Sequence, residues 1–254
     1  MLTSIRGIVA ATLVAGSAML ATPAFAEDKS ESDISISGNA SVVSEYRFRG
    51  VGLSGGDIAV QGGIDVGHSS GFYVGTWGSS LADCGPGTIA DACYGSVELD
   101  LYGGWSGDIA DGITADVGAI YYAYPNSRKT VPATDYDYIE FYASLGFTVG
   151  PAEATVGVAY APDQNSLGST DNIYVYTDLG VDIPDTPLSL SAHLGYTDGF
   201  LTYTADGKAF DWSVGASLSL TDNLSVGVSY VGVEGGNVDG VTDDAVVATL
   251  SVEF

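Results

Sequence analysis

The sequence is poor in basic residues, in histidine, in cysteine and in long apolar runs. It has 7 Lys and Arg against 32 Asp and Glu, which argues against nucleic-acid binding because that partner requires a basic surface. After residue 26 no run reaches 18 consecutive apolar residues, so no membrane-spanning helix is expected there. These shortages exclude nucleic-acid-binding proteins and helical membrane proteins.

The two cysteines, Cys84 and Cys93, are separated by eight residues that include Gly85, Pro86 and Gly87. In an exported protein, an even pair of cysteines in one loop is typical of a disulfide. Free thiols or a metal pair are the alternatives, but no His lies nearby to complete a metal site. We predict a Cys84–Cys93 disulfide, no metal and no cofactor.

The first 26 residues have the features of an export signal. Arg6 supplies a positive charge, Gly7–Ala21 is apolar, and Ala24-Phe25-Ala26 fits a small-x-small cleavage site. A retained membrane anchor is the alternative, but the apolar run is short and ends at a good cleavage site. We predict a cleaved signal peptide over residues 1–26 and one domain over residues 27–254.

The remaining chain is both acidic and apolar. Without Arg6, six basic residues face 32 acidic ones, a formal charge of −26. A disordered acidic chain is contradicted by 16 Tyr, 8 Phe, 3 Trp and a mean hydropathy of +0.22. Because backbone in lipid must be fully paired, such an exported chain is either a closed barrel or a secreted sandwich with an unusually apolar surface.

Apolar residues alternate with other residues along most of the chain, and turn residues interrupt the alternation. The last segment has an apolar face and ends on Phe254, as outer-membrane barrels usually do. The pattern predicts twelve strands, around Ile34–Phe48, Ile58–Val66, Phe72–Ser79, Val97–Trp105, Ile113–Tyr121, Ile139–Val149, Ala154–Tyr160, Ile173–Val181, Leu188–Tyr196, Phe210–Leu220, Leu224–Tyr230 and Val246–Phe254.

The predicted connections alternate between long and short, which is typical of outer-membrane barrels with long outer loops and short periplasmic turns. A sandwich has no reason to sort its loops in this way. An even strand count also brings both chain ends to the periplasmic side. We therefore expect an all-β fold, a transmembrane antiparallel up-and-down β-barrel of about 12 strands closed by pairing of its last and first strands.

The second face of the predicted strands is rich in carboxylates and tyrosine, and in a barrel this face lines the lumen. The charged candidates for the pore lining are Glu45, Arg47, Arg49, Glu98, Asp100, Asp116, Glu140, Asp178, His193 and Asp211.

Arg47 and Arg49 could form the cationic side of a pore constriction, opposite carboxylates such as Glu98, Asp100 and Glu140. Alternatively, they neutralise buried carboxylates in a structural ion-pair network.

Two other features suggest chemistry only weakly. Ser191 and His193 share a face, but a hydrolase needs a third orienting group, so no enzyme is expected. Acids in the outer loops could bridge divalent cations and lipopolysaccharide phosphates, although no loop has a calcium-motif spacing; solvated surface acids are the alternative.

Three segments carry a resemblance to a known family: Ser44–Gly50, Gln61–Asp65 and Ser70–Ser79. The Tyr-x-Phe-Arg-Gly and Gly-Phe-Tyr-x-Gly-x-Trp elements within them resemble the TorF family of porins, catalogued as conserved hypothetical outer-membrane proteins of proteobacteria. The resemblance implies an outer-membrane barrel of a Gram-negative bacterium and assigns no functional residues.

The expected function is passive diffusion of small cationic or neutral solutes through a narrow acidic lumen in the cell outer membrane. The expected partners are outer-membrane lipid and lipopolysaccharide, the solutes, and the barrel-assembly machinery, which would read the C-terminal strand and Phe254. One alternative is a non-conducting barrel that is structural or acts as a receptor through its loops. The other is a soluble secreted sandwich.

Overall fold

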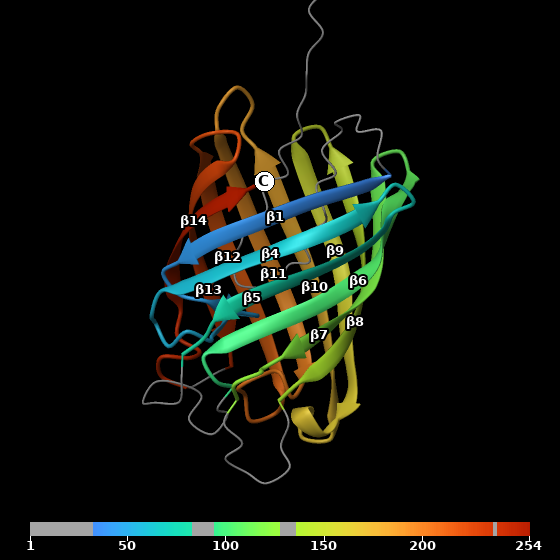
Figure 1. Cartoon of the computed structure of the whole chain (residues 1–254). Helices are drawn as coiled ribbons and strands as arrows, with labels where there is room; N and C mark the ends of the chain where they lie inside the picture. The colour runs from blue at the N-terminus through green and yellow to red at the C-terminus, as the bar shows by residue number, and fades with distance from the viewer. Residues whose placement is uncertain (1–32, 83–93, 128–135, 236–237) are drawn as a thin grey trace, which may run out of the picture.

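The computed structural model describes residues 33–82, 94–127, 136–235 and 238–254. Within these ranges, twelve strands form one closed antiparallel barrel in which neighbours in sequence are neighbours in space (Figure 1). No described helix is long and apolar enough to cross a membrane. The barrel strands are β1 (Ile34–Val43), β4 (Ala59–His68), β5 (Phe72–Ser80), β6 (Val97–Ala110), β7 (Ile113–Ala123), β8 (Tyr138–Val149), β9 (Ala152–Gln164), β10 (Thr170–Asp182), β11 (Leu188–Gly199), β12 (Lys208–Ser219), β13 (Leu224–Glu234) and β14 (Ala245–Glu253).

The barrel closes where its last strand pairs with its first. In the β1–β14 ladder, Ala40 lies opposite Val252 and Val43 lies opposite Thr249. The backbone of Phe254 extends the pairing, because its N–H donates to Gly38 O at 2.9 Å and its carbonyl accepts from Gly38 N at 2.7 Å. Closure leaves the barrel without an unpaired edge. The predicted fold and the predicted pairing of the first and last strands are confirmed.

The two faces of the strands differ as the alternation predicts. Large apolar side chains on the outer face are exposed, among them Ile64, Phe72, Leu101 and Phe141. The inner face carries buried tyrosines, carboxylates, serines and small residues. The barrel is therefore apolar outside and polar inside, the reverse of a soluble protein.

The two ends of the barrel also differ. Two-residue to five-residue turns connect the strands at one end, at 69–71, 111–112, 150–151, 183–187 and 220–223. Glycines in the left-handed region form several of these turns, including Gly71, Gly112 and Gly150. The other end, at the bottom of Figure 1, carries most of the longer connections and the 3-10 helix η1 (Asn165–Leu167). Phe254 lies at the end with the short turns.

The first strand is shorter than predicted. β1 ends at Val43, and residues 44–58, here called the inner loop, turn into the barrel and carry the short ladder of β2 (Arg47–Phe48) and β3 (Val51–Gly52). Positive φ angles of 49° at Arg49 and 79° at Gly50 form the turn between them. The period-two pattern continues through β2, because β2 is itself extended, and therefore could not show where the chain leaves the barrel wall.

Two predictions concern residues outside the described ranges. The signal peptide over residues 1–26 precedes the first described residue, and Cys84 and Cys93 both lie within residues 83–93. Both predictions stay open.

Tyrosine rings cover glycines of neighbouring strands on the inner face. Tyr142 lies opposite Gly118, and Tyr176 lies opposite Gly157. A Cβ atom built on Gly118 would meet the Tyr142 ring and the carbonyl oxygen of Gly103, so the absence of a side chain allows the ring to lie against the wall.

We expect Gly118→Ala to lower the thermal stability of the refolded barrel, by about 1–3 kcal/mol, because the added methyl group overpacks the Tyr142 contact. Heat-modifiable gel mobility followed against temperature measures this loss. Gly180→Ala is the matched control, since nothing lies within 4 Å of a Cβ atom built there. Equal melting of the two variants would show that the tyrosine–glycine contact is unimportant.

Candidate functional site

The inner loop is fastened to the connection between β13 and β14. Arg47 donates through Nη1 to the carbonyl oxygens of Gly50 at 3.0 Å and Asp243 at 2.7 Å, and its Nη2 lies 2.9 Å from Glu45 Oε1. A backbone bond from Gly52 N to Val241 O at 2.8 Å adds a second attachment. Arg47 is 3% exposed. It thus holds the loop in place through buried backbone carbonyls and pairs with Glu45 of its own loop.

Arg49 connects the inner loop to the far wall of the barrel. Its Nη2 lies 2.6 Å from Glu140 Oε1 on β8, and its guanidinium carbon lies 4.1 Å from the centre of the Tyr174 ring on β10. Arg49 and Glu140 are 5% and 2% exposed. Burial alone would lower the pKa of Arg49, but the Glu140 carboxylate raises it above the ordinary value, so the guanidinium stays charged. An ion pair therefore bridges the lumen.

A second group contains two carboxylates. Glu98 accepts hydrogen bonds from the Tyr46 hydroxyl at 2.7 Å and the Tyr124 hydroxyl at 3.0 Å. Asp100 follows on the same face of β6, and both carboxylates are 1% exposed. Among the described residues neither has an ion-pair partner, so Arg47 and Arg49 neutralise neither of them. Burial and the nearby Glu98 charge raise the pKa of Tyr46, which keeps this hydroxyl protonated as a donor.

The third group surrounds His193 on β11. Its Nδ1 lies 2.6 Å from Asp178 and its Nε2 lies 2.9 Å from Asp211, whose carboxylate also accepts from the Tyr174 hydroxyl at 3.0 Å. Because ionised carboxylates only accept, both ring nitrogens donate. With both nitrogens engaged, His193 is not arranged as a base toward Ser191.

Asp116 belongs to a fourth group, nearer the short turns. It accepts from the Tyr73 hydroxyl at 2.7 Å, and that hydroxyl is also 2.5 Å from the hydroxyl of Tyr142. On the neighbouring strands the Tyr102 hydroxyl donates to Asp65 at 2.6 Å. Tyrosine hydroxyls are thus the main partners of the acids in this half of the lumen.

The structure places all ten predicted charged residues inside the barrel. It brings Arg49 together with Glu140, Arg47 with Glu45, and His193 with Asp178 and Asp211. It corrects the expected positions of three of them, because Glu45, Arg47 and Arg49 lie on the inner loop and not on the first strand. Phe254 is on the outside, with 72% of its surface exposed.

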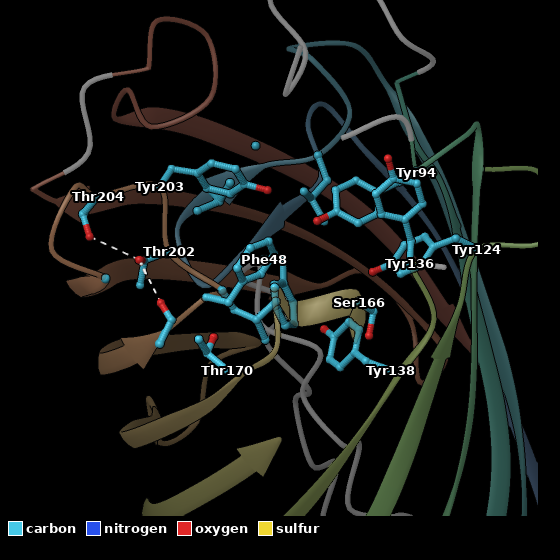
Figure 2. Close-up of a pocket in the computed structure, with 18 of the residues that line it drawn as sticks. Phe48, Tyr94, Tyr124, Tyr136, Tyr138, Ser166, Thr170, Thr202, Tyr203 and Thr204 are labelled. Carbon is cyan, nitrogen blue, oxygen red and sulfur yellow. Dashed lines mark hydrogen bonds between the residues drawn. The ribbon is translucent and has the colours of Figure 1, made fainter. Parts of the chain in front are cut away.

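Sequence reasoning missed a cavity at the long-loop end, here called the mouth cavity. Its volume is about 960 Å³, and Phe48, Tyr94, Tyr124, Tyr136 and Tyr138 contribute to its lining (Figure 2). Three of these tyrosines lie in or next to connections, where period-two alternation carries no information. The available sequence signal was a group of tyrosines flanking the connection between the fifth and sixth predicted strands: Tyr122, Tyr124, Tyr136 and Tyr138.

We expect Arg49→Met to lower the free energy of unfolding by about 3–5 kcal/mol, because it leaves the buried Glu140 carboxylate without its partner. The double variant Arg49→Met/Glu140→Leu should recover most of this loss, since it removes both charges. Thermal unfolding of the refolded proteins in detergent measures the cycle. Additive losses in the two single variants and the double variant would mean that the residues are not coupled.

Two solved porin structures were found to be similar to this chain. The NanC porin shares 11% identity with this chain, with 87% of this chain and 99% of the porin covered at a TM-score of 0.57. At this identity the similarity shows the fold alone. A Salmonella typhi OmpF complex with daunomycin covers 87% of this chain and 97% of its own at 11% identity, but its TM-score of 0.40 supports no argument.

Other comparisons give the family without an activity. No curated protein matches the sequence. Within the described ranges, no group of His, Cys, Asp and Glu side chains could hold a metal ion. A family described as "Bacterial protein of unknown function (Gcw_chp)" matches residues 27–253, nearly the whole chain, and the protein belongs to this family.

Proposed function

We propose that the protein is a small outer-membrane porin, of the kind that the TorF resemblance implies, through which small cationic or neutral solutes diffuse. The observation that carries this proposal is the charge distribution inside a barrel with an apolar exterior. Carboxylates line the interior from the mouth to the short turns, and the inner loop places Arg49 across the lumen from Glu140.

The apolar exterior supports the outer-membrane location. Exposed side chains such as Ile64, Leu101 and Phe141 would contact the acyl chains of lipid and lipopolysaccharide. Export would use the signal peptide over residues 1–26, and the family match begins at residue 27. The exposed C-terminal strand with Phe254 would be the element that the assembly machinery reads.

The unpaired carboxylates supply the selectivity. Glu98 and Asp100 lie below the mouth without an ion-pair partner among the described residues, and an ionised carboxylate at this place attracts cations and repels anions. Arg49 opposes this field from the inner loop. A barrel of twelve strands is also narrow, between the filled eight-strand barrels and the wide porins.

A non-conducting barrel is the second candidate, and the burial of the inner loop favours it. Arg47, Arg49 and Gly50 are buried inside the barrel, as are the Glu140 and Tyr174 side chains that they approach. If the loop blocks passage, the protein would be a structural element or a receptor that uses its outer loops. We do not propose an enzyme, because both nitrogens of His193 are engaged by carboxylates.

Single-channel recording of the refolded protein in a planar bilayer decides between the two candidates. The porin should give stable, cation-selective steps. Replacing Arg47 and Arg49 together with Ala should raise both conductance and cation selectivity, because the substitution loosens the inner loop and removes its positive charge.

The opposite charge change and a remote control complete this experiment. Glu98→Gln/Asp100→Asn should lower cation selectivity, whereas Asp185→Asn, in a turn at the other end, should leave it unchanged. A silent bilayer with folded protein would reject the porin and favour the non-conducting barrel. Unchanged selectivity in the charge variants would reject the proposed constriction.

We expect the exported protein to begin at Glu27, because Ala24-Phe25-Ala26 presents a signal-peptidase site. Intact-mass measurement of protein purified from outer membranes checks this start. The same spectrum, recorded before and after reduction, reports the Cys84–Cys93 disulfide, which we also propose. A mass that retains residues 1–26 in the outer-membrane fraction would contradict the cleavage.

A further inference from the structure

The mouth cavity lies between the inner loop and four of the connections between strands. Figure 2 shows Phe48 of the inner loop near its centre, with Tyr94, Tyr124 and Tyr136 together on one side and Tyr203 on another. At about 960 Å³ it is large enough for a small organic molecule. A solute entering the barrel from the long-loop end would meet it before the Arg49–Glu140 pair.

Aromatic rings form one wall of the cavity. The Tyr94 ring lies 4.7 Å from Tyr124 and 5.0 Å from Tyr136, centre to centre, at interplanar angles of 47° and 58°. Tyr94 and Tyr203, from different connections, are also hydrogen-bonded to each other. Because the rings are tilted rather than stacked, this wall can present part of a ring face to a ligand. Tyr94 is half-buried and Tyr136 is 7% exposed, so Tyr94 offers the larger surface.

Acidic side chains outnumber basic ones among the described residues around the cavity. Its described lining residues include Asp171, Asp198 and Asp206 and no Lys or Arg. Arg49, whose guanidinium carbon lies 4.8 Å from the centre of the Phe48 ring, is paired with Glu140. Glu98 lies behind the wall, hydrogen-bonded to the hydroxyl of Tyr124 and without an ion-pair partner among the described residues. Lys208 pairs with Asp198 at 3.2 Å, and among the described residues no ion pair compensates Asp171 or Asp206. This field disfavours an anionic ligand.

The threonine hydroxyls of the cavity wall are already engaged within the protein. Thr202 donates to Gly199 O at 3.2 Å, Thr204 donates to Thr202 at 3.2 Å, and Thr170 donates to Leu167 O at 2.9 Å. A sugar would need several free donors and acceptors to replace its bonds to water. The wall therefore offers aromatic faces and negative charge more readily than a hydrogen-bonding array.

We propose that the mouth cavity binds small organic cations, with an ammonium group held against the tyrosine rings and an apolar or aromatic body packed on Phe48. Cation–π attraction and the surrounding carboxylates act on the same charge. The assignment names a solute class for the pore and rests on the proposed porin function for its role in transport. Binding itself requires only the folded barrel.

Isothermal titration of the refolded protein in detergent with benzyltrimethylammonium tests the proposal. Benzoate, benzyl alcohol and maltose serve as anionic, neutral aromatic and sugar probes. The cation should bind most tightly, and its affinity should fall as salt is raised. Equal or tighter binding of any of the other three probes, or no binding of the cation, would overturn the proposal.

Variants at Tyr136 separate a cation–π contact from simple packing. Tyr136→Leu should weaken benzyltrimethylammonium binding about fivefold, which corresponds to the loss of one such contact, whereas Tyr136→Phe should stay within about twofold. Tyr94→Leu and Tyr94→Phe repeat the comparison at the ring beside it. Heat-modifiable mobility confirms that each variant is folded, and equal affinities of the Leu and Phe variants at both positions would reject the contact.

The experiments distinguish a failure of the proposed cation binding from a failure of the proposed conduction. A barrel that conducts cations in the bilayer but does not bind benzyltrimethylammonium overturns the assignment of the cavity and leaves the porin. A barrel that binds the cation but stays silent in the bilayer rejects the porin and retains a cation-binding mouth.

Discussion

The backbone ladder between β1 and β14 is the constraint on which the rest of the structure depends. A sheet surrounded by apolar side chains cannot leave a row of unpaired N–H and C=O groups at its edges, because each would be buried without a partner. The β1–β14 pairing, extended by the two backbone bonds between Gly38 and Phe254, removes both edges at once. Closure also creates the lumen. Inward carboxylates and tyrosines from opposite walls become neighbours only because the barrel is closed.

The lumen is occupied by a segment that is not one of the barrel strands. The inner loop leaves β1 after Val43 and is held by Arg47 on backbone carbonyls at one side and by Arg49 on Glu140 at the other. Each arginine is buried, so each needs its partners, and the loop is fixed because both requirements are met together. The two readings of these arginines, a constriction and a structural ion-pair network, therefore describe the same contacts. In the proposed porin, the ion pair that holds the loop across the lumen would lie on the path of the solute.

Tyrosine has two roles along this path. Inside the barrel its hydroxyl groups satisfy carboxylates, as Tyr46 and Tyr124 do for Glu98 and Tyr73 does for Asp116. At the mouth the rings of Tyr94 and Tyr136 line the cavity that we propose as a ligand site. The lumen acids have few basic residues to pair with. Under the proposals above, the rings would extend a preference for cations outward to the entrance. The mouth cavity and the lumen are thus compatible with one class of solute.

The sequence by itself determined the strands, their even number, the closed architecture and which residues face inward, since period-two alternation and turn residues report these locally. It therefore predicted Glu98, Asp116, Glu140, Asp178, His193 and Asp211 on the inner face. Only the tertiary structure decided that Arg47 and Arg49 leave the wall, because an extended segment alternates equally well in a barrel strand or in a loop inside the barrel. Arg49 pairs with Glu140, which is 91 positions away in sequence. The mouth cavity is likewise assembled from separate connections. Both depend on which residues the closed barrel brings opposite each other, and a local sequence pattern does not predict such long-range contacts.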